Sequence, residues 1–483
     1  MRYHTILDAL KEHAWKKEQR LCMADKAKAV TYGQFYDAVL RGAAYLAANH
    51  LKQGEIVAIQ SSQTIECVAA LFAVQSAGGT ACLLEKNVSG KRRMDILQQL
   101  HCHYLIVGKI TKLEHVCCLD LQQLYTYPQK IKAPYFAETA DILFTTGTTG
   151  KPKGIMVSHE ADVAIAENVI DSVQMIEEEV ELITSPCSHS LALRRIYAAI
   201  YLGSAVILTE NVLLHDNFYR LLEQYQVTAI TLVPAVLNLL LEATGDQIRK
   251  YAKQLHYIQL GSAPLAEEMK QRLVRLLPGV RLYNTYGATE SGCTVIFEFS
   301  RYLDKKGCIG RTTVHAGIRF VDADGNVTDA RDEKTAGFLA FQGAMNMSGY
   351  LYDQDLTKTV LRDGIVYTND IGYRGNDQMI YFIGRAGEVI NCGGYKISPS
   401  EIEETAKQFP GIADCACVPM TDRRVGEVPK LLIQLERNAL DEKEFRKWMR
   451  SNLEEYKVPK AIGYIEKIPR TFNGKIQRRR LGI

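Results

Sequence analysis

Short apolar runs alternate with helical segments through the first half of the chain, and this alternation restricts the possible fold more than any other feature of the sequence. Runs typical of buried strands cover residues 56–60, 80–84, 104–107, 205–209, 229–233 and 257–260. Segments with helical spacing of apolar residues cover 64–76, 160–175 and 218–225. Strands and helices that alternate in this way form parallel sheets with helices on their faces. The sequence therefore predicts a doubly wound α/β architecture.

Other segments of the sequence add expectations about a helix cap, a β-rich region and the division into domains. Near the N-terminus, Thr31 is placed to cap a helix. Residues 294–382 form short, glycine-punctuated, β-rich segments, in which Asp324 and Gly325 predict a tight turn. A chain of 483 residues exceeds the size of a single core. We expect a large N-terminal domain at 1–385, made of doubly wound α/β subdomains plus a β-rich subdomain, and a small α+β C-terminal domain at 386–483.

Composition and charge favour an ordinary globular enzyme of the cytoplasm. The formal net charge is only +3, so nothing indicates nucleic acid or a membrane surface as a partner. The best candidate for a spanning helix, at 191–208, is interrupted by Arg194 and Arg195, and the N-terminus does not resemble a signal peptide. The twelve cysteines have no framework spacing and are expected to be reduced. A cluster of His and Cys at 101–118 lacks the paired spacing of a zinc site.

The segment from Asp141 to His159 carries the strongest chemical signal in the chain. After the apolar run at 142–144 come ten residues without an apolar side chain, TTGTTGKPKG. Their glycines allow a ligand to approach the backbone closely, and their hydroxyl and ammonium groups donate to anionic oxygens. A solvated surface turn is the alternative, and the spacing does not fit a G-x-x-x-x-G-K-[ST] loop. These residue types predict a loop that binds polyphosphate.

This segment resembles the phosphate loop of the adenylate-forming superfamily, which contains acyl-CoA synthetases, nonribosomal adenylation domains and luciferases. Further resemblances follow in the superfamily's order at 261–264, at the N-x-Y-G-x-T-E pattern that ends at Glu290, and at the pattern that ends at Asp370. Three more lie at 384–385, at 391–403, and at P-R-T-x-x-G-K over 469–475. The ordered set covers most of the chain, and its form is closest to acyl- and aryl-CoA ligases.

The resemblance implies a nucleotide-binding role for residues in these motifs. Tyr286 can stack on a purine, Thr289 can donate to a phosphate, and Glu290 is a hard-oxygen ligand suited to Mg²⁺. Asp370 is expected to accept hydrogen bonds from the ribose hydroxyls. Asn369 replaces the usual glycine before it, a change that we expect asparagine's tolerance of the left-handed conformation to accommodate. The residues predicted to bind ATP or AMP are Thr145, Thr146, Gly147, Thr148, Thr149, Gly150, Lys151, Lys153, Gly154, Gly261, Ser262, Ala263, Pro264, Asn284, Tyr286, Gly287, Asp370 and Arg385.

The C-terminal motifs imply a catalytic lysine and a hinge. Lys475 is predicted to stabilise the negative charge that grows when the substrate carboxylate attacks the α-phosphorus of ATP, and a solvated basic tail is the alternative. Glu388 takes the place of the superfamily's hinge residue. Gly393, Gly394 and Tyr395 are predicted to lie along the pantetheine arm of coenzyme A. By this resemblance the C-terminal domain is mobile and rotates about Glu388 between two half-reactions.

The acyl pocket is predicted from residues 186–189, which resemble the P-x-x-H of acyl- and aryl-CoA ligases. His189 then borders the pocket, and Ser190 stands where amino-acid-activating relatives carry an aspartate. This argues against an amino-acid substrate. Arg194 and Arg195 could bind the second carboxylate of a dicarboxylic acid, but surface arginines or a structural ion pair are the favoured interpretation.

Together the motifs predict an acid–thiol ligase. A small-molecule carboxylic acid is activated by ATP and Mg²⁺ to an acyl-adenylate, pyrophosphate leaves, and the acyl group passes to the thiol of coenzyme A. One alternative is a ligase that loads a separate phosphopantetheinyl carrier protein. Another is a non-catalytic nucleotide-binding protein, which is disfavoured because the expected functional residues are present. The predicted catalytic residues are Lys475, Glu290, Thr289 and His189.

Overall fold

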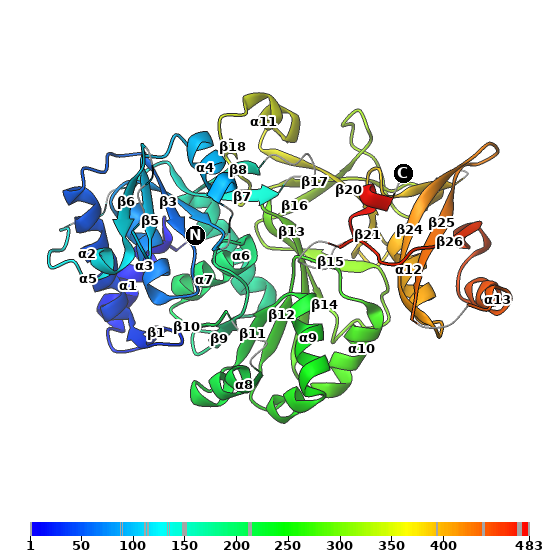
Figure 1. The fold of residues 1–483 in the computed structure, drawn as a ribbon, viewed down its shortest axis with the longest axis horizontal. Coiled ribbons are helices and arrows are strands. Elements are labelled where there is room, and N and C mark those ends of the chain that lie inside the picture. Colours follow the sequence, from blue (N-terminus) through cyan, green and yellow to red (C-terminus); the bar gives the residue numbers. More distant parts are fainter. Residues whose placement is uncertain are drawn as a thin grey trace.

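Three β-sheets follow one another along the molecule, from the N-terminal end to the C-terminal end (Figure 1). The computed structural model describes residues 2–86, 88, 90–110, 113, 115–132, 134, 136–146, 152–210, 215–392, 395–436, 440–470 and 476–481. The α/β fold class, with an α+β unit at the C-terminal end, is as predicted.

The first sheet is largely parallel and has the strand order β18-β8-β7-β4-β3-β5-β6. Its strands are β3 (Ile56–Gln60), β4 (Thr80–Leu84), β5 (Tyr104–Val107), β6 (Cys117–Asp120), β7 (Thr139–Thr146), β8 (Pro152–Ser158) and β18 (Gly349–Tyr350). β7, β4, β3, β5 and β6 run parallel, while β8 and β18 are antiparallel additions at one edge. The predicted strands at 56–60, 80–84 and 104–107 are confirmed residue for residue, since each is a short apolar run that ends at polar or glycine-rich segments.

The second sheet has the order β16-β17-β20-β21-β15-β14-β13-β12-β11-β9-β10-β1-β2, with β19 paired to β20. It is antiparallel from β16 to β13, parallel from β13 to β1, and antiparallel again between β1 and β2. Its strands are β1 (Leu21–Ala24), β2 (Ala29–Thr31), β9 (Val180–Ile183), β10 (Ala205–Leu208), β11 (Ala229–Leu232), β12 (Tyr257–Leu260), β13 (Arg281–Ala288), β14 (Gly292–Glu298), β15 (Cys308–Thr312), β16 (Gly317–Val321), β17 (Gly337–Gln342), β19 (Leu361–Arg362), β20 (Ile365–Arg374) and β21 (Ile380–Arg385). The β-rich segment is antiparallel as expected, but it continues the parallel sheet through β14 and β15. The predicted turn is present: Gly325 has a φ of 90°, and its N–H donates to the Asp322 carbonyl at 3.1 Å.

Helices cover the sheets and fill the space between the first two of them. They are α1 (Ile6–Lys16), α2 (Tyr32–Ala48), α3 (Ile65–Ser76), α4 (Gly90–Gln99), α5 (Leu121–Thr126), α6 (His159–Val173), α7 (Ser190–Leu202), α8 (His215–Gln224), α9 (Pro234–Thr244), α10 (Glu267–Leu276) and α11 (Gln354–Val360), with the 3₁₀ turn η1 (Gln247–Tyr251). Thr31 caps α2 in a capping box with Gln34, as predicted. The largest hydrophobic cluster takes residues from both sheets and from α3, α6 and α7, so the main core lies between the sheets (Figure 1).

The third sheet forms the C-terminal end of the molecule and has its own core. It has the order β23-β22-β25-β24, with β26 paired to β25, and lies beside β20 and β21 (Figure 1). Its elements are β22 (Ile390–Cys392), β23 (Tyr395–Ile397), β24 (Ile412–Asp422), β25 (Gly426–Leu435), β26 (Ala461–Tyr464), α12 (Pro399–Lys407), α13 (Glu442–Asn452), η2 (Glu455–Lys457) and η3 (Arg478–Leu481). Within the described part of the chain, no helix has the length and apolar character needed to cross a membrane.

Candidate active site

The carboxyl ends of neighbouring parallel strands meet at one edge of the second sheet. β9, β11, β12 and β13 lie side by side in this order. β9 leads into the loop that ends at His189, β12 leads to Gly261, and β13 carries Asn284 and Tyr286. A Cβ atom on Gly261 would lie 3.1 Å from Cδ1 of Leu191, so the loop after β12 packs against the first turn of α7. Open α/β sheets bind ligands at such edges, and three of the predicted motifs converge here.

The loop after β12 holds an unusual backbone conformation. Ser262, the second residue of the predicted Gly261–Pro264 segment, has a φ of 68°. Residues other than glycine adopt this left-handed region at a cost, and such strain persists where the surroundings fix the loop. The loop is therefore held in one shape beside the predicted nucleotide site.

Asp370 is held by side chains from two other strands. The Tyr286 hydroxyl donates to Oδ2 of Asp370 at 2.5 Å, and Nε of Arg385 donates to Oδ1 at 3.0 Å. Asp370 and Arg385 face each other across the antiparallel pair β20–β21. Burial, together with the Asp370 carboxylate, raises the pKa of Tyr286 well above its ordinary value, so the hydroxyl remains a donor. Three predicted nucleotide-binding residues thus form one hydrogen-bonded group, named the ribose cluster below.

The residue before Asp370 does not need a left-handed backbone. Asn369 lies within β20 and is extended, and its carbonyl accepts a hydrogen bond from Ala386 N–H at 2.7 Å. The Asp370 N–H in turn donates to Oγ1 of Thr368 at 3.1 Å. The expectation of a left-handed conformation at Asn369 is therefore wrong. Any residue can be extended, so asparagine adds no backbone strain here.

Tyr350 connects the strand after the predicted phosphate loop with Glu290. Lys153 faces Thr145 across β7–β8, and its ammonium lies 5.7 Å from the centroid of the Tyr350 ring. Tyr350 belongs to β18, which pairs with β8, and its hydroxyl donates to Oε1 of Glu290 at 2.8 Å. Burial, with the Glu290 carboxylate, raises the pKa of Tyr350, which keeps this donor protonated. The predicted phosphate and metal residues are thereby joined through one tyrosine.

Two observations fit the predicted ATP and Mg²⁺. Oδ1 of Asn284 is buried and has no hydrogen-bond partner among the described residues, and the amino group of an adenine is the kind of donor that it needs. Glu290 offers a carboxylate that Tyr350 already orients, and carboxylate oxygens are ligands that Mg²⁺ prefers. Both residues belong to one short stretch, 283–290, which also contains Tyr286. The side chains present therefore suit a magnesium nucleotide.

Arg194 and Arg195 belong to buried ion networks. The Arg194 guanidinium donates to both oxygens of Asp141, at 3.0 and 3.1 Å, and to Asp162. Arg195 donates to the two oxygens of Glu181 at 2.7 and 2.5 Å. The two arginine side chains are only 5% and 1% exposed. The guanidinium N–H groups of Arg194 that donate to Asp141 and Asp162 are not available to a substrate carboxylate. The geometry therefore favours a structural ion pair over the predicted place of Arg194 in an acyl pocket.

His189 lies at the end of the loop after β9 and directly precedes α7. Its N–H donates to the Pro186 carbonyl at 2.9 Å, which closes a turn, and Ser190 is the first residue of the helix. Burial lowers the pKa of the His189 imidazole, although Glu85 opposes the shift, so the ring is neutral at pH 7. A neutral imidazole at this position is compatible with the border of an acyl pocket.

Tyr395 and Lys457 connect the third sheet with the rest of the chain. The Tyr395 ring stacks on Tyr456 with 4.3 Å between centroids, and the Lys334 ammonium lies 4.8 Å above it. Lys457 is 4% exposed in its side chain, and its Nζ lies 3.5 Å from a carboxylate oxygen of Glu333. Lys334 and Glu333 follow the turn after β16, so both contacts cross between the second and third sheets.

The remaining predicted residues divide into those with a described position and those without. Glu388 lies in the turn between β21 and β22, where its N–H donates to the Arg385 carbonyl at 2.8 Å. Thr145 and Thr146 end β7. The residues that lie outside the described part of the chain are Gly147, Thr148, Thr149, Gly150, Lys151, Gly393, Gly394 and Lys475.

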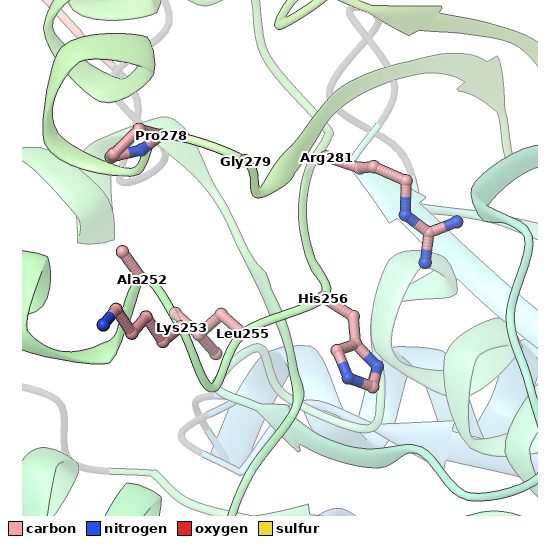
Figure 2. A pocket seen from close by; sticks show the side chains of 7 residues that line it. All are labelled: Ala252, Lys253, Leu255, His256, Pro278, Gly279 and Arg281. Atoms are coloured by element: carbon pink, nitrogen blue, oxygen red, sulfur yellow. The ribbon is translucent and has the colours of Figure 1, made fainter.

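Two open surface hollows lie away from these motifs. One, of about 490 Å³, is lined by Lys253, His256 and Arg281 among others (Figure 2). Arg281 donates to the Val173 carbonyl at 2.8 Å, and His256 lies 3.0 Å from Glu179, so both polar groups have protein partners. The other contains part of the His and Cys cluster noted in the sequence. Among the described residues no group of His, Cys, Asp or Glu is arranged to hold a metal ion, and all twelve cysteines are free thiols.

Sequence reasoning did not identify Tyr350 or Lys457. Tyr350 is 60 positions from Glu290, and Lys457 is 124 positions from Glu333. Neither residue stands in a stretch of unusual composition, so nothing in the local sequence indicates its partner. Only the tertiary structure reveals these contacts.

Comparison with known proteins decides the family. A family model described as AMP-binding enzyme matches residues 10–351, and one described as AMP-binding enzyme C-terminal domain matches residues 401–475. The chain belongs to the AMP-binding enzyme family. The resemblance of the ordered motifs to adenylate-forming enzymes is therefore confirmed.

Individual AMP-binding enzymes resemble this chain over almost its whole length. The 2-succinylbenzoate–CoA ligase of Bacillus cytotoxicus is 26% identical over 484 residues, which cover 99% of this chain and 98% of the relative. The o-succinylbenzoate CoA synthetase of Bacillus subtilis, MenE, has been solved with its acyl-adenylate OSB-AMP and with ATP and magnesium ion. Both structures align with a TM-score of 0.85 and 24% identity, and cover 98% of this chain and 98% or 99% of the other. The predicted enzyme class, an AMP-forming acid–thiol ligase, is confirmed. The ATP and magnesium ion bound by MenE are the same ligands that the motifs predict for this chain.

Proposed function

We propose that this AMP-binding enzyme activates a carboxylic acid, aromatic or otherwise but not an amino acid, and transfers the acyl group to coenzyme A. The first candidate for the acid is 2-succinylbenzoate. The relatives named above support this acid, since they resemble the chain from end to end. The observation that carries the assignment of the site is the single stretch 283–290. It joins the ribose cluster, through Tyr286, to the predicted Mg²⁺ ligand Glu290.

In this proposal, different described residues bind the ribose, the adenine and the magnesium ion in the first half-reaction. Asp370, oriented by Tyr286 and Arg385, would accept hydrogen bonds from the ribose, and Asn284 would accept one from adenine. Magnesium bound at Glu290 would neutralise charge on the phosphates. The substrate carboxylate is then the nucleophile toward the α-phosphorus, and pyrophosphate is the leaving group. Positioning and electrostatic stabilisation supply most of the catalysis of such a phosphoryl transfer.

We assign the second half-reaction to the C-terminal domain, with a boundary at residues 385–386. The turn that contains Glu388 lies between the second and third sheets, which supports its role as the hinge. Gly393, Gly394 and Tyr395 would then line the path of pantetheine. A carrier protein would present the same pantetheine thiol as coenzyme A, so it remains the second candidate acceptor.

The identity of the acid and of the acceptor is tested by pyrophosphate release. The enzyme is incubated with ATP, Mg²⁺ and a panel of acids that includes 2-succinylbenzoate, malonate, benzoate and several amino acids, with and without coenzyme A. We expect 2-succinylbenzoate to give the highest kcat/KM and a CoA thioester. Acyl-adenylate without transfer to coenzyme A would favour the carrier protein, and no ATP-dependent pyrophosphate with any acid would contradict the proposal.

The role of Lys475 has its own test. We expect Lys475→Ala to abolish acyl-adenylate formation and to spare thioester formation from synthetic acyl-adenylate, because the ammonium acts on charge that develops only in the first step. Single-turnover assays of the two steps make the measurement. Lys460→Ala, which removes a half-exposed lysine from the same domain, is the control and should leave both steps unchanged. Equal loss of both steps in Lys475→Ala would contradict the assignment.

A further inference from the structure

Gln63 contacts the loop that ends at His189 from the opposite sheet. It lies between β3, in the first sheet, and α3, and its side chain is buried. The loop between β9 and α7, residues 184–189, belongs to the second sheet. Nε2 of Gln63 donates to the Ser185 carbonyl at 2.7 Å, and Oε1 accepts from the Cys187 N–H at 2.9 Å and from the Cys187 thiol at 2.6 Å. One amide therefore forms hydrogen bonds with the backbone of the loop on both sides of Pro186, with the carbonyl of Ser185 and the N–H of Cys187.

This set of bonds requires a glutamine amide in one orientation. A buried N–H needs an acceptor and a buried carbonyl needs a donor, and an amide provides both from a single planar group without a change of protonation. Ser185 and Cys187 are 5% and 1% exposed, so water cannot easily replace either bond. Gln63 is itself tied down, since its N–H donates to Oε1 of Glu210 at 3.0 Å.

The hydrogen bonds of the Gln63 amide act directly on the turn that carries His189. The His189 N–H donates to the carbonyl of Pro186, the residue between the two positions that Gln63 holds. His189 in turn precedes α7, whose Leu191 packs against Gly261 of the nucleotide site. A shift of the turn would thus move the imidazole and the first turn of α7 together.

We propose that Gln63 is a positioning residue for the acyl pocket: it fixes the 185–189 turn, and thereby the His189 ring, across the boundary between the first two sheets. This inference rests on the proposed function, in which His189 borders the bound acid. The Gln63 amide is engaged by Ser185 and Cys187, so in this inference it acts on the acid through the position of His189. Its loss should therefore affect the KM for the acid more than the KM for ATP.

The test compares Gln63→Leu with the wild type in ATP–pyrophosphate exchange, with 2-succinylbenzoate as the acid. We expect the KM for the acid to rise at least tenfold and the KM for ATP to change less than twofold. Gln254→Leu is the matched control, because Gln254 also donates to two backbone carbonyls, those of Leu222 and Val227 at 2.9 Å each, but far from the His189 turn. It should change neither KM more than twofold.

Two further variants separate positioning from a general loss of stability. Gln63→Glu keeps the acceptor for Cys187 but places an oxygen against the Ser185 carbonyl. Protonation of this glutamate restores a donor, so the raised KM for the acid should fall toward the wild-type value as the pH is lowered from 8 to 6. Cys187→Ala removes only the thiol bond and should raise the KM for the acid less than threefold.

The outcomes distinguish this inference from the proposed function. A wild-type enzyme that activates no acid contradicts the proposed function. An active wild type with an unchanged KM for the acid in Gln63→Leu, or with equal rises in both KM values, overturns the inference alone. If Gln63→Leu does not fold, a KM for the acid that does not depend on pH in Gln63→Glu overturns it instead.

Discussion

Two arginine clusters differ in their surroundings: one is buried inside the fold, and the other lies in the predicted nucleotide site. Arg195 lies between the first two sheets, where Glu181 and Gln259 accept its hydrogen bonds at 2.5 to 2.7 Å. Arg385 is the last residue of β21 and donates to Asp370 at 3.0 Å. The Arg195 side chain is 1% exposed, whereas that of Arg385 is 44% exposed.

The difference in exposure decides what each cluster can do. In the buried cluster both charges have left water, and each depends on the other for compensation. In the ribose cluster the guanidinium remains in contact with solvent, so a ligand can share or replace its hydrogen bonds at little cost. Proximity to a sequence motif is therefore a weaker guide to function than the presence of a solvent-exposed donor.

The largest expected effect follows from breaking the buried cluster. Arg195→Met should lower the free energy of unfolding by about 3–5 kcal/mol, because it leaves the Glu181 carboxylate buried without a cation. Urea denaturation at pH 7 measures this loss. The matched variant Arg385→Met should cost less than about 1 kcal/mol, since its ion pair is partly exposed. Similar losses in the two variants would refute the contrast between the clusters.

The next effect concerns function in the ribose cluster. Asp370→Asn removes a charged acceptor, and hydrogen bonds to charged groups contribute about 1.5–3 kcal/mol. The KM for ATP should therefore rise roughly tenfold to a hundredfold, with a change of less than about 1 kcal/mol in unfolding free energy. ATP–pyrophosphate exchange and urea denaturation provide the two readouts. An unchanged KM for ATP would show that Asp370 does not contact the nucleotide.

A smaller effect is expected where Tyr350 meets Glu290. Tyr350→Phe keeps the ring beside Lys153 and removes only the hydroxyl that donates to the carboxylate. The loss of one hydrogen bond of about 1 kcal/mol should raise the Mg²⁺ concentration for half-maximal activity about fivefold. Titration of Mn²⁺ binding by electron paramagnetic resonance gives a readout independent of turnover. Tyr352→Phe, at a surface position, serves as the control, and an equal shift in both variants would contradict the role of Tyr350.

The smallest effect concerns a carboxyl group near α10. Burial, followed by the nearby Glu267 carboxylate, raises the pKa of Glu404 in α12 to about 7, although Lys270 and Lys407 oppose the shift. A carboxyl whose folded pKa is raised binds a proton more tightly in the folded state, so its contribution to stability is complete below pH 4.5 and is lost as the pH rises through about 7. Glu404→Gln should therefore raise the melting temperature more at pH 8 than at pH 5.5. Equal shifts at both pH values would contradict this.

The sequence by itself determined the secondary structure of the parallel sheets and the chemistry of the motifs. The strands β3, β4, β5 and β12 agree with the apolar runs residue for residue, and Thr31 caps α2, because strand periodicity and helix capping depend on residues close together in the chain. The resemblance of the motifs to a known superfamily predicted one nucleotide site for Tyr286, Asp370 and Arg385, and these three side chains are in contact.

Only the tertiary structure decided which charged and polar groups are buried and paired with other protein side chains. Arg194 is 53 positions from Asp141, and Gln63 is 124 positions from Cys187, yet each pair is in contact. Burial and pairing depend on neighbours that strand order brings together, and the local sequence does not contain this information. For the same reason, the sequence could not show that the β-rich segment continues the second sheet, or that Tyr350 holds Glu290.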